Sequence, residues 1–170
     1  MIIDTKIRYF TLLVIPLTLL VLLSAVSFAD TDAISQESDI NKEKIELYKQ
    51  ALETNPDDAG IHYNLGVAYG NSGMYKEAIE SYKQATGINP DYAKAYYNLG
   101  IVYENSGMNK EAIESYMQTI RIDPDYAKAH YNLGVVYGLS GMYEEAIESC
   151  KQVIRIDPDD TDTHYNLGLA

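Results

Sequence analysis

Cysteine and tryptophan are almost missing from this chain. Cys150 is the only cysteine among 170 residues, and there is no tryptophan. One cysteine cannot form an intrachain disulfide, and no Cys-x-x-Cys pair or Cys/His cluster has the spacing of a zinc site. Packing of side chains must therefore hold the fold together, and we expect no metal or other cofactor.

Positive charge is also scarce. The chain has 13 Lys and Arg residues against 25 Asp and Glu residues, so its formal net charge is -12. No run of basic residues interrupts this acidic background. Because phosphate backbones and anionic lipid surfaces repel an acidic protein, we expect nucleic acid not to be a partner.

A long uncharged stretch occurs only at the N-terminus. Residues 9–29 carry no charge and follow Lys6 and Arg8, and small side chains stand at Ser27 and Ala29. A positive start, an apolar middle and small residues before a cleavage point are typical of a secretory signal. The alternative is an uncleaved anchor, because a bilayer span takes ~20 residues.

Both interpretations of residues 1–29 predict export. Positive residues before an apolar stretch stay in the cytoplasm, so the part of the chain that follows crosses the membrane. It would be periplasmic or secreted, or held outside the cytoplasm by the anchor. Contact with a membrane is expected only through this segment. Residues 30–38 are polar and without pattern, which predicts a flexible leader.

One four-residue motif recurs at a fixed distance. Tyr-Asn-Leu-Gly begins at Tyr63, Tyr97, Tyr131 and Tyr165, each 34 residues after the last. Such a period indicates a stacked array of repeats. In each period apolar residues follow helical spacing twice, a glycine-containing turn divides the two runs, and a proline ends the second. The sequence thus predicts helix–turn–helix units at 59–92, 93–126 and 127–160.

These positions closely resemble the tetratricopeptide repeat (TPR) family. Its pattern is an aromatic residue, then x-x-Leu-Gly-x-x-Tyr, then Ala-x-x-x-aromatic, then Pro. The resemblance implies an all-α fold, a right-handed α-solenoid of stacked helix–turn–helix repeats. In order, the three units match the pattern at His62, Leu65, Gly66, Tyr69, Ala78, Tyr82 and Pro90; at Tyr96, Leu99, Gly100, Tyr103, Ala112, Tyr116 and Pro124; and at His130, Leu133, Gly134, Tyr137, Ala146, Cys150 and Pro158.

The array is incomplete at both ends. Residues 39–58 match only the second helix of a unit, and residues 161–170 stop within the first helix of a fourth unit. A helix that short is marginal by itself. We therefore predict either that the sequence is a piece of a longer array or that this end docks on another molecule.

Glycine recurs in the middle of each first helix, where it costs roughly 1 kcal/mol relative to alanine. A recurrent cost needs a recurrent compensation. We expect each glycine to face an alanine of the second helix, so that the two helices approach closely. The expected pairs are Gly66 with Ala78, Gly100 with Ala112, and Gly134 with Ala146.

No constellation of residues predicts catalysis, and we expect the protein not to be an enzyme. His62, His130 and His164 occupy the aromatic position of the repeat, which indicates packing, because equivalent atoms of successive repeats lie too far apart to share a metal. Cys150 stands where the other units have tyrosine, and we expect a buried, inert thiol. The recurring glutamates indicate a solvated helix face.

The family resemblance implies a binding site in the concave groove lined by the first helices of the units. Family members commonly bind extended peptide segments there. An asparagine side chain offers a donor and an acceptor that match a peptide unit, and lysines favour an acidic ligand. Carried over position by position, the groove residues of this chain are Tyr63, Asn64, Lys94, Tyr97, Asn98, Ile101, Lys128, Tyr131, Asn132 and Val135.

The sequence therefore predicts an exported TPR scaffold that binds an extended peptide segment of a partner protein in this groove. Two alternatives stay open. The C-terminal end could serve as an assembly surface for a second copy, giving a homo-oligomer, or for another chain. The chain could also be the repeat arm of a longer enzyme. No motif identifies the partner.

Overall fold

The computed structural model describes residue 36 and residues 38–159. The predicted signal or anchor at 1–29 and the incomplete fourth unit at 161–170 lie outside the described residues. The chain divides into two compact units, Met1–Ile40 and Asn41–Ala170. All helix pairs of the described residues belong to the second unit.

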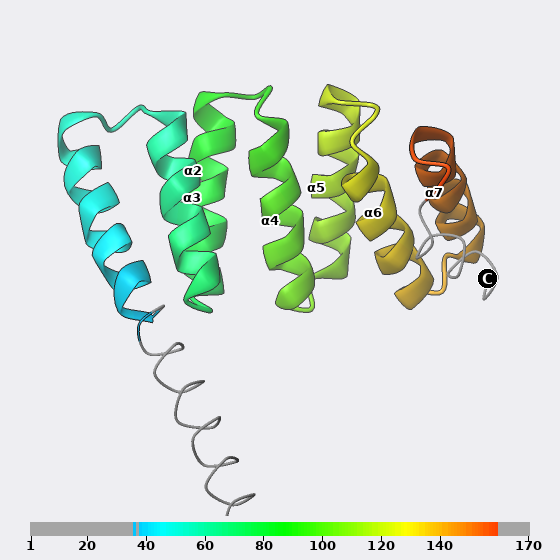
Figure 1. Cartoon of the computed structure of the whole chain (residues 1–170), viewed down its shortest axis with the longest axis horizontal. Coiled ribbons are helices and arrows are strands. Elements are labelled where there is room, and N and C mark those ends of the chain that lie inside the picture. The colour runs from blue at the N-terminus through cyan, green and yellow to red at the C-terminus, as the bar shows by residue number, and fades with distance from the viewer. Residues whose placement is uncertain (1–35, 37, 160–170) are drawn as a thin grey trace, which may run out of the picture. The chain divides into compact units, whose positions relative to one another are not determined.

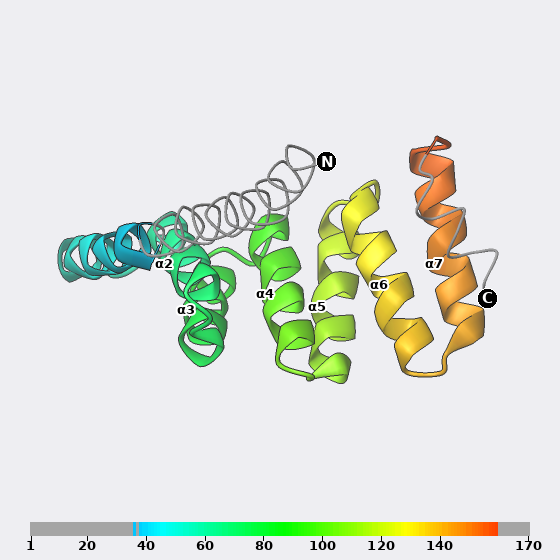
Figure 2. The ribbon, with the colours of Figure 1, turned by 60° about the horizontal axis from the view of Figure 1, so that its bottom comes forward.

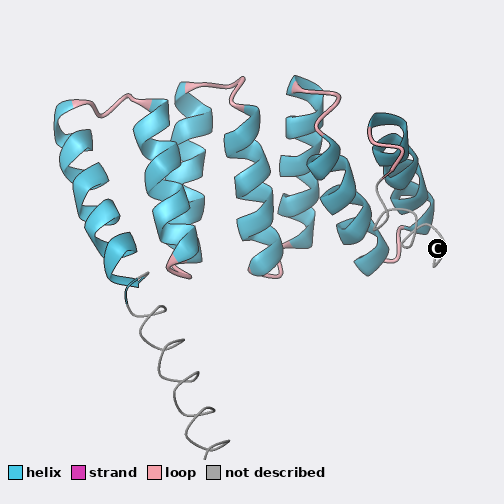
Figure 3. Ribbon diagram, in the orientation of Figure 1, coloured by secondary structure: helices cyan, strands magenta, loops and turns pink. Residues whose placement is uncertain are grey.

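The described residues of this unit form a row of antiparallel helix pairs, as Figures 1 and 3 show. Successive helices lie side by side in chain order, which Figure 2 shows from a second direction. We call α2, α4 and α6 the A helices and α3, α5 and α7 the B helices. A helix over residues 38–54 leads into α2 (Ala59–Asn71), α3 (Tyr75–Ile88), α4 (Ala93–Asn105), α5 (Asn109–Ile122), α6 (Ala127–Leu139) and α7 (Tyr143–Ile156).

This arrangement confirms the predicted α-solenoid of helix–turn–helix repeats. Each A helix packs on the B helix of its own unit, and α3 and α5 also pack on the A helix of the next unit. Among residues 38–159, no helix has both the length and the apolarity needed to cross a bilayer.

Glycine makes the tight turn from each A helix to its B helix. Gly73, Gly107 and Gly141 have φ values of 70°, 72° and 75°, a left-handed conformation that only glycine adopts without cost. In the second unit the next residue then bonds back to the helix, with the Met108 amide 2.9 Å from the carbonyl of Tyr103. Helix α5 starts one residue later, so α4 and α5 fold back against each other.

The histidines fill the aromatic position as predicted, and they also fasten the start of the A helices. The His130 side chain is 8% exposed, and its Nε2 lies 3.0 Å from the carbonyl oxygen of Pro124. His62 makes the same contact with Pro56 at 2.8 Å. Each ring therefore ties an A helix to the loop that precedes it. His164 lies outside the described residues.

At Gly66 and Gly100 the expected pairing of glycine with alanine is wrong in its detail, whereas at Gly134 the backbone oxygen of Ala146 is among the nearest neighbours. The nearest atoms to a methyl group added at Gly66 or Gly100 belong to the tyrosine one turn after the alanine. That methyl carbon would lie 2.7 Å from the Tyr82 ring at Gly66 and 2.5 Å from the Tyr116 ring at Gly100. Gly66 and Gly100 therefore make room for an aromatic ring and not only for a close helix approach.

One continuous apolar core runs from the helix at residues 38–54 to α6. It contains the tyrosine rings that the glycines admit, together with the leucine and valine side chains of the A helices and the alanines of the B helices. Its buried members are Ile45, Leu65, Ala68, Tyr69, Ala78, Tyr82, Leu99, Val102, Tyr103, Ala112, Tyr116, Leu133 and Val136.

Candidate peptide-binding groove on the A helices

The predicted groove residues lie along the A helices, which are neighbours in space. Helices α2 and α4 contact each other directly, and between them is a hollow of about 200 Å³. Val67 and Ile101 supply apolar walls, and Asn98 supplies an amide. We call this surface the A-helix groove. The hollow is lined by Val67, Gly70, Asn71, Tyr75, Tyr82, Asn98, Ile101, Val102 and Asn105.

Tyrosine rings pack against one another, tilted, in the same way in two units. The Tyr63 ring lies 5.9 Å from Tyr82 of its own B helix and 5.1 Å from Tyr92, which precedes the next A helix. Tyr97 is placed 5.9 Å from Tyr116 and 5.0 Å from Tyr126. Ring pairs at these separations attract each other. These contacts therefore join each of the two A helices to its own B helix and to the residue that begins the next A helix.

The asparagines of the Tyr-Asn-Leu-Gly motif extend this connection. Asn98 donates its side-chain N–H to the hydroxyl of Tyr63 at 3.2 Å. Asn132 donates to Tyr97 at 3.3 Å and to Tyr116 at 3.4 Å. Each bond crosses from one unit to the one before it. The asparagine amides that were expected to hold a peptide therefore also hold the array together.

One polar contact is particular to the second unit. The Tyr116 hydroxyl donates a hydrogen bond to a carboxylate oxygen of Glu104 at 2.7 Å. The corresponding residues of the first and third units are Gly70 and Gly138, which have no side chain. Burial first, and the nearby Glu104 carboxylate second, raise the pKa of Tyr116. The hydroxyl stays protonated and able to donate at neutral pH.

Some of the remaining predicted residues are exposed to solvent, and the others are half-buried in the wall of the groove. Asn64 is exposed on α2, and Lys94 and Lys128 are exposed in the first turns of α4 and α6. Ile101 and Val135 are half-buried in equivalent positions of successive units, and Tyr131 is half-buried as well. The structure thus provides a groove with apolar walls, amides on its floor and a lysine in the second and third units.

The lone cysteine behaves as its position predicts. Cys150 is buried, and burial raises the pKa of its thiol. A thiol that holds its proton is a poor nucleophile and a poor metal ligand. Within residues 38–159, no three His, Cys, Asp or Glu side chains cluster as metal ligands.

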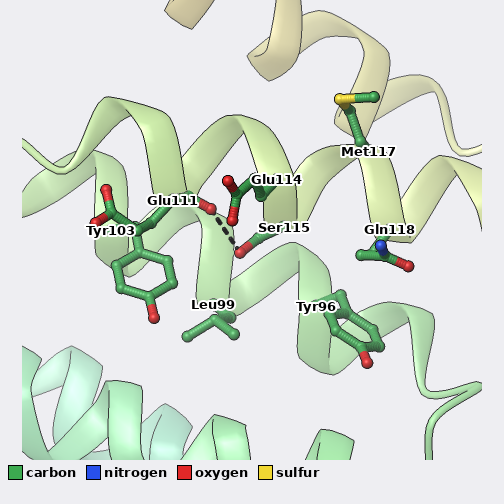
Figure 4. Close-up of a pocket in the computed structure, with 8 residues that line it drawn as sticks. All are labelled: Tyr96, Leu99, Tyr103, Glu111, Glu114, Ser115, Met117 and Gln118. Carbon is green, nitrogen blue, oxygen red and sulfur yellow. Dashed lines mark hydrogen bonds between the residues drawn. The ribbon is translucent and has the colours of Figure 1, made fainter.

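Two larger hollows lie on the opposite side of the A helices, and sequence analysis did not predict them. Figure 4 shows the first, a hollow of about 400 Å³ between α4 and α5. Its lining includes Tyr96, Leu99 and Tyr103 of α4 together with Ser115 of α5, whose hydroxyl donates to the Glu111 carbonyl at 2.8 Å. The only sequence signal for it was the helical spacing of these aromatic and apolar residues.

Comparison with protein-family models agrees with this geometry. A model described as TPR repeat matches residues 42–73, 71–107 and 105–141, and one described as Tetratricopeptide repeat matches residues 127–160. The chain belongs to the tetratricopeptide repeat family. As a TPR protein with this fold, it is a scaffold for protein interaction.

Solved structures of TPR-like fold also resemble this chain. A crystal structure of MamA is 32% identical with a TM-score of 0.71, and the match covers 74% of this chain and 73% of that one. A second crystal structure of MamA protein is 30% identical over 79% of both chains, with a TM-score of 0.71. MamA 41-end from Desulfovibrio magneticus RS-1 is 25% identical over 76% of this chain and 73% of that one, again with a TM-score of 0.71. No curated protein sequence matches this TPR chain.

Proposed function

We propose that this TPR protein binds an extended peptide segment of a partner protein in the A-helix groove. The observation that carries the proposal is the hollow between α2 and α4, which Val67, Ile101 and Asn98 line together. An extended peptide has apolar side chains on one side and backbone donors and acceptors along its length. Such a segment can satisfy both kinds of surface at once.

The charges along the groove favour an acidic segment. Lys94 and Lys128 are exposed at equivalent positions of α4 and α6, while the protein as a whole carries a formal charge of -12. Exposed lysines act mainly on the rate of encounter and on the choice of partner, and salt screens them. Binding should therefore weaken as salt is added.

The test is a crosslinking pull-down with the full chain and a variant that carries Lys94→Glu and Lys128→Glu. The structure argues against Asn98→Ala for this purpose, because that amide also bonds to Tyr63. We expect the two reversed charges to reduce capture of the partner at least tenfold. Peptides from the captured partner should then compete for the wild-type chain in a salt-dependent manner.

A matched control reverses two lysines away from the groove. Lys76 and Lys110 are exposed at equivalent positions of α3 and α5, so Lys76→Glu with Lys110→Glu changes the net charge equally. This control should capture the partner as the wild type does. Equal capture by the groove variant and the wild type, with unchanged helix content, would exclude the A-helix groove as the site.

We further propose that the repeats act outside the cytoplasm. The support is the order of charged, apolar and small residues in 1–29. A full chain tagged at its C-terminus should be found in the periplasmic or secreted fraction of a bacterial host, or, if the anchor is kept, in the membrane fraction with the tag accessible from outside the cytoplasm. Its mass would show whether the chain begins at Asp30 or keeps the apolar segment. Recovery of the protein from the cytoplasm would contradict the proposal.

A further inference from the structure

The second hollow on the B-helix side is larger and has a different lining from the first. It has a volume of about 470 Å³ and lies between α5 and α7, above α6. That volume is within the range of ~300–1,000 Å³ usual for ligand sites. We call it the B-face pocket. Its lining residues are Met117, Ile120, Arg121, His130, Leu133, Tyr137, Glu145, Glu148, Ser149 and Gln152.

Apolar side chains form the middle of the B-face pocket. Leu133 of α6 is buried, Ile120 of α5 is half-buried beside it, and the Met117 side chain is 52% exposed. The Tyr137 hydroxyl lies 3.7 Å from the Met117 sulfur, to which it donates. A thioether adapts its shape to many apolar ligands. The pocket thus offers an apolar floor with an adaptable wall.

Opposite charges stand at the two ends of this floor. Glu145 is in the first turn of α7, and Arg121 is in the last turn of α5. Both side chains are exposed, and neither forms an ion pair with another residue in the described part of the chain. Because the B helices run parallel, the carboxylate and the guanidinium lie at opposite ends of the pocket.

The equivalent hollow of the second unit does not have an arginine at one end and an apolar floor beside it. Its neighbouring B helix is α3, whose corresponding residues are Lys83, Thr86 and Gly87 in place of Met117, Ile120 and Arg121. The Lys83 ammonium sits 5.9 Å from the centre of the Tyr103 ring. The apolar floor with an arginine at its end is therefore a feature of the α5–α7 pocket alone among the described units.

We propose that the B-face pocket binds a segment of a partner protein that carries a basic and an acidic residue with apolar residues between them. The basic residue pairs with Glu145, the acidic residue pairs with Arg121, and the apolar side chains cover Leu133 and Ile120. This site is separate from the A-helix groove and does not depend on the proposed function there.

The spacing of the two charges predicts the form of the segment. Glu145 corresponds by the repeat to position 111 of α5, and the ten residues from there to Arg121 span roughly 15 Å at 1.5 Å per residue. An extended chain advances ~3.3 Å per residue. Glu145 and Arg121 lie on different helices, and packed helices are at least ~10 Å apart, so the two charges are roughly 18 Å or more apart. Side chains on one side of an extended chain are an even number of positions apart. The basic and acidic residues of the bound segment should therefore be about six positions apart.

Methionine methyl NMR on the full chain tests the site directly. The probe is a blocked peptide, Lys-Ser-Leu-Ser-Leu-Ser-Glu, whose charged and apolar side chains lie on one side of an extended chain. A second peptide with glutamine in place of both charged residues is its control. The charged peptide should shift the Met117 methyl signal and leave Met74, at the first turn before α3, unchanged. Shifts of equal size at both methionines, or no shift at Met117, would overturn the proposal.

A matched variant gives the pocket the residues of the first unit. Met117→Lys, Ile120→Thr and Arg121→Gly together reproduce positions that the same fold already accepts at 83, 86 and 87. We expect at least tenfold weaker binding of the charged peptide by fluorescence anisotropy, with unchanged helical circular dichroism. Equal affinity would overturn the proposal.

If the triple variant loses helix content, a single substitution at an exposed residue can replace it in the test. Glu145→Gln removes one charge from a solvent-facing side chain. It should weaken binding of the charged peptide several-fold and leave the weaker binding of the glutamine peptide unchanged. Equal changes for both peptides would contradict the proposed pairing of a basic residue with Glu145.

Discussion

At the scale of single residues, three glycines with the same sequence context meet different neighbours. Gly66 and Gly100 lie under the rings of Tyr82 and Tyr116, whereas Gly134 faces the smaller Cys150, whose sulfur would be 3.5 Å from an added methyl group. The repeat pattern makes these glycines look equivalent. The residue on the opposite helix decides whether the space is full.

This difference predicts opposite outcomes for two identical substitutions. Gly100→Ala places a methyl carbon 2.5 Å from the Tyr116 ring, and such overpacking should lower the free energy of unfolding by about 1–3 kcal/mol. Gly134→Ala meets its nearest neighbour at 3.4 Å and gains helix propensity worth up to about 1 kcal/mol. Urea unfolding followed by circular dichroism measures both.

The second substitution is the control for the first. Both exchange glycine for alanine within an A helix and at the same position of the repeat. If Gly134→Ala destabilised the protein as much as Gly100→Ala, the tyrosine ring would not be the reason that glycine is needed.

At the scale of elements, the joints between units combine apolar packing with a recurring polar bond. Asn98 of α4 reaches back to Tyr63 of α2, and Asn132 of α6 reaches back to Tyr97 of α4. Each donor and acceptor pair is 35 residues apart in the sequence. The motif that marks the repeat therefore also supplies both partners of the bond between repeats.

Loss of one such bond should weaken the joint measurably. Asn98→Ala removes the donor to the half-buried Tyr63 hydroxyl, and we expect a loss of about 0.5–1.5 kcal/mol in the free energy of unfolding. Asn64→Ala, at the equivalent but exposed position, should change it by less than about 0.5 kcal/mol. Equal effects in urea unfolding would show that the inter-unit bond does not contribute.

At the scale of the whole molecule, buried phenols make the stability of the array depend on alkaline pH. Burial raises the pKa of Tyr82 and Tyr116 far above the usual phenol value, and it is also the main cause of the smaller rises at Tyr97 and Tyr126. An unfolded chain ionises its tyrosines near pH ~10. Above that pH the unfolded chain binds fewer protons than the folded chain, so stability falls as the pH rises.

The stability that these neutral phenols provide is fully present below pH ~10 and is lost above it. We expect helical circular dichroism to decrease cooperatively above that pH, and the last tyrosinate absorbance to appear together with unfolding. Exposed residues such as Tyr143 should ionise earlier. Ionisation of every tyrosine near pH ~10 with full helix content would contradict this prediction.

The sequence by itself determined the period, the helix pairs and the family of this protein. Apolar spacing and the glycine and proline positions act within a few residues of the chain, so the turn at Gly107 and the start of α5 could be predicted from local rules. The row of candidate groove residues followed from the same period.

Only the tertiary structure decided what these residues contact. The rings that fill the space beside Gly66 and Gly100, the bonds that occupy Asn98 and Asn132, and the polarity of the B-face pocket all join residues distant in sequence. Glu145 and Arg121 line one pocket because two parallel helices stack on a third. Stacking brings such residues together, and no local pattern in the chain records which side chain will meet which.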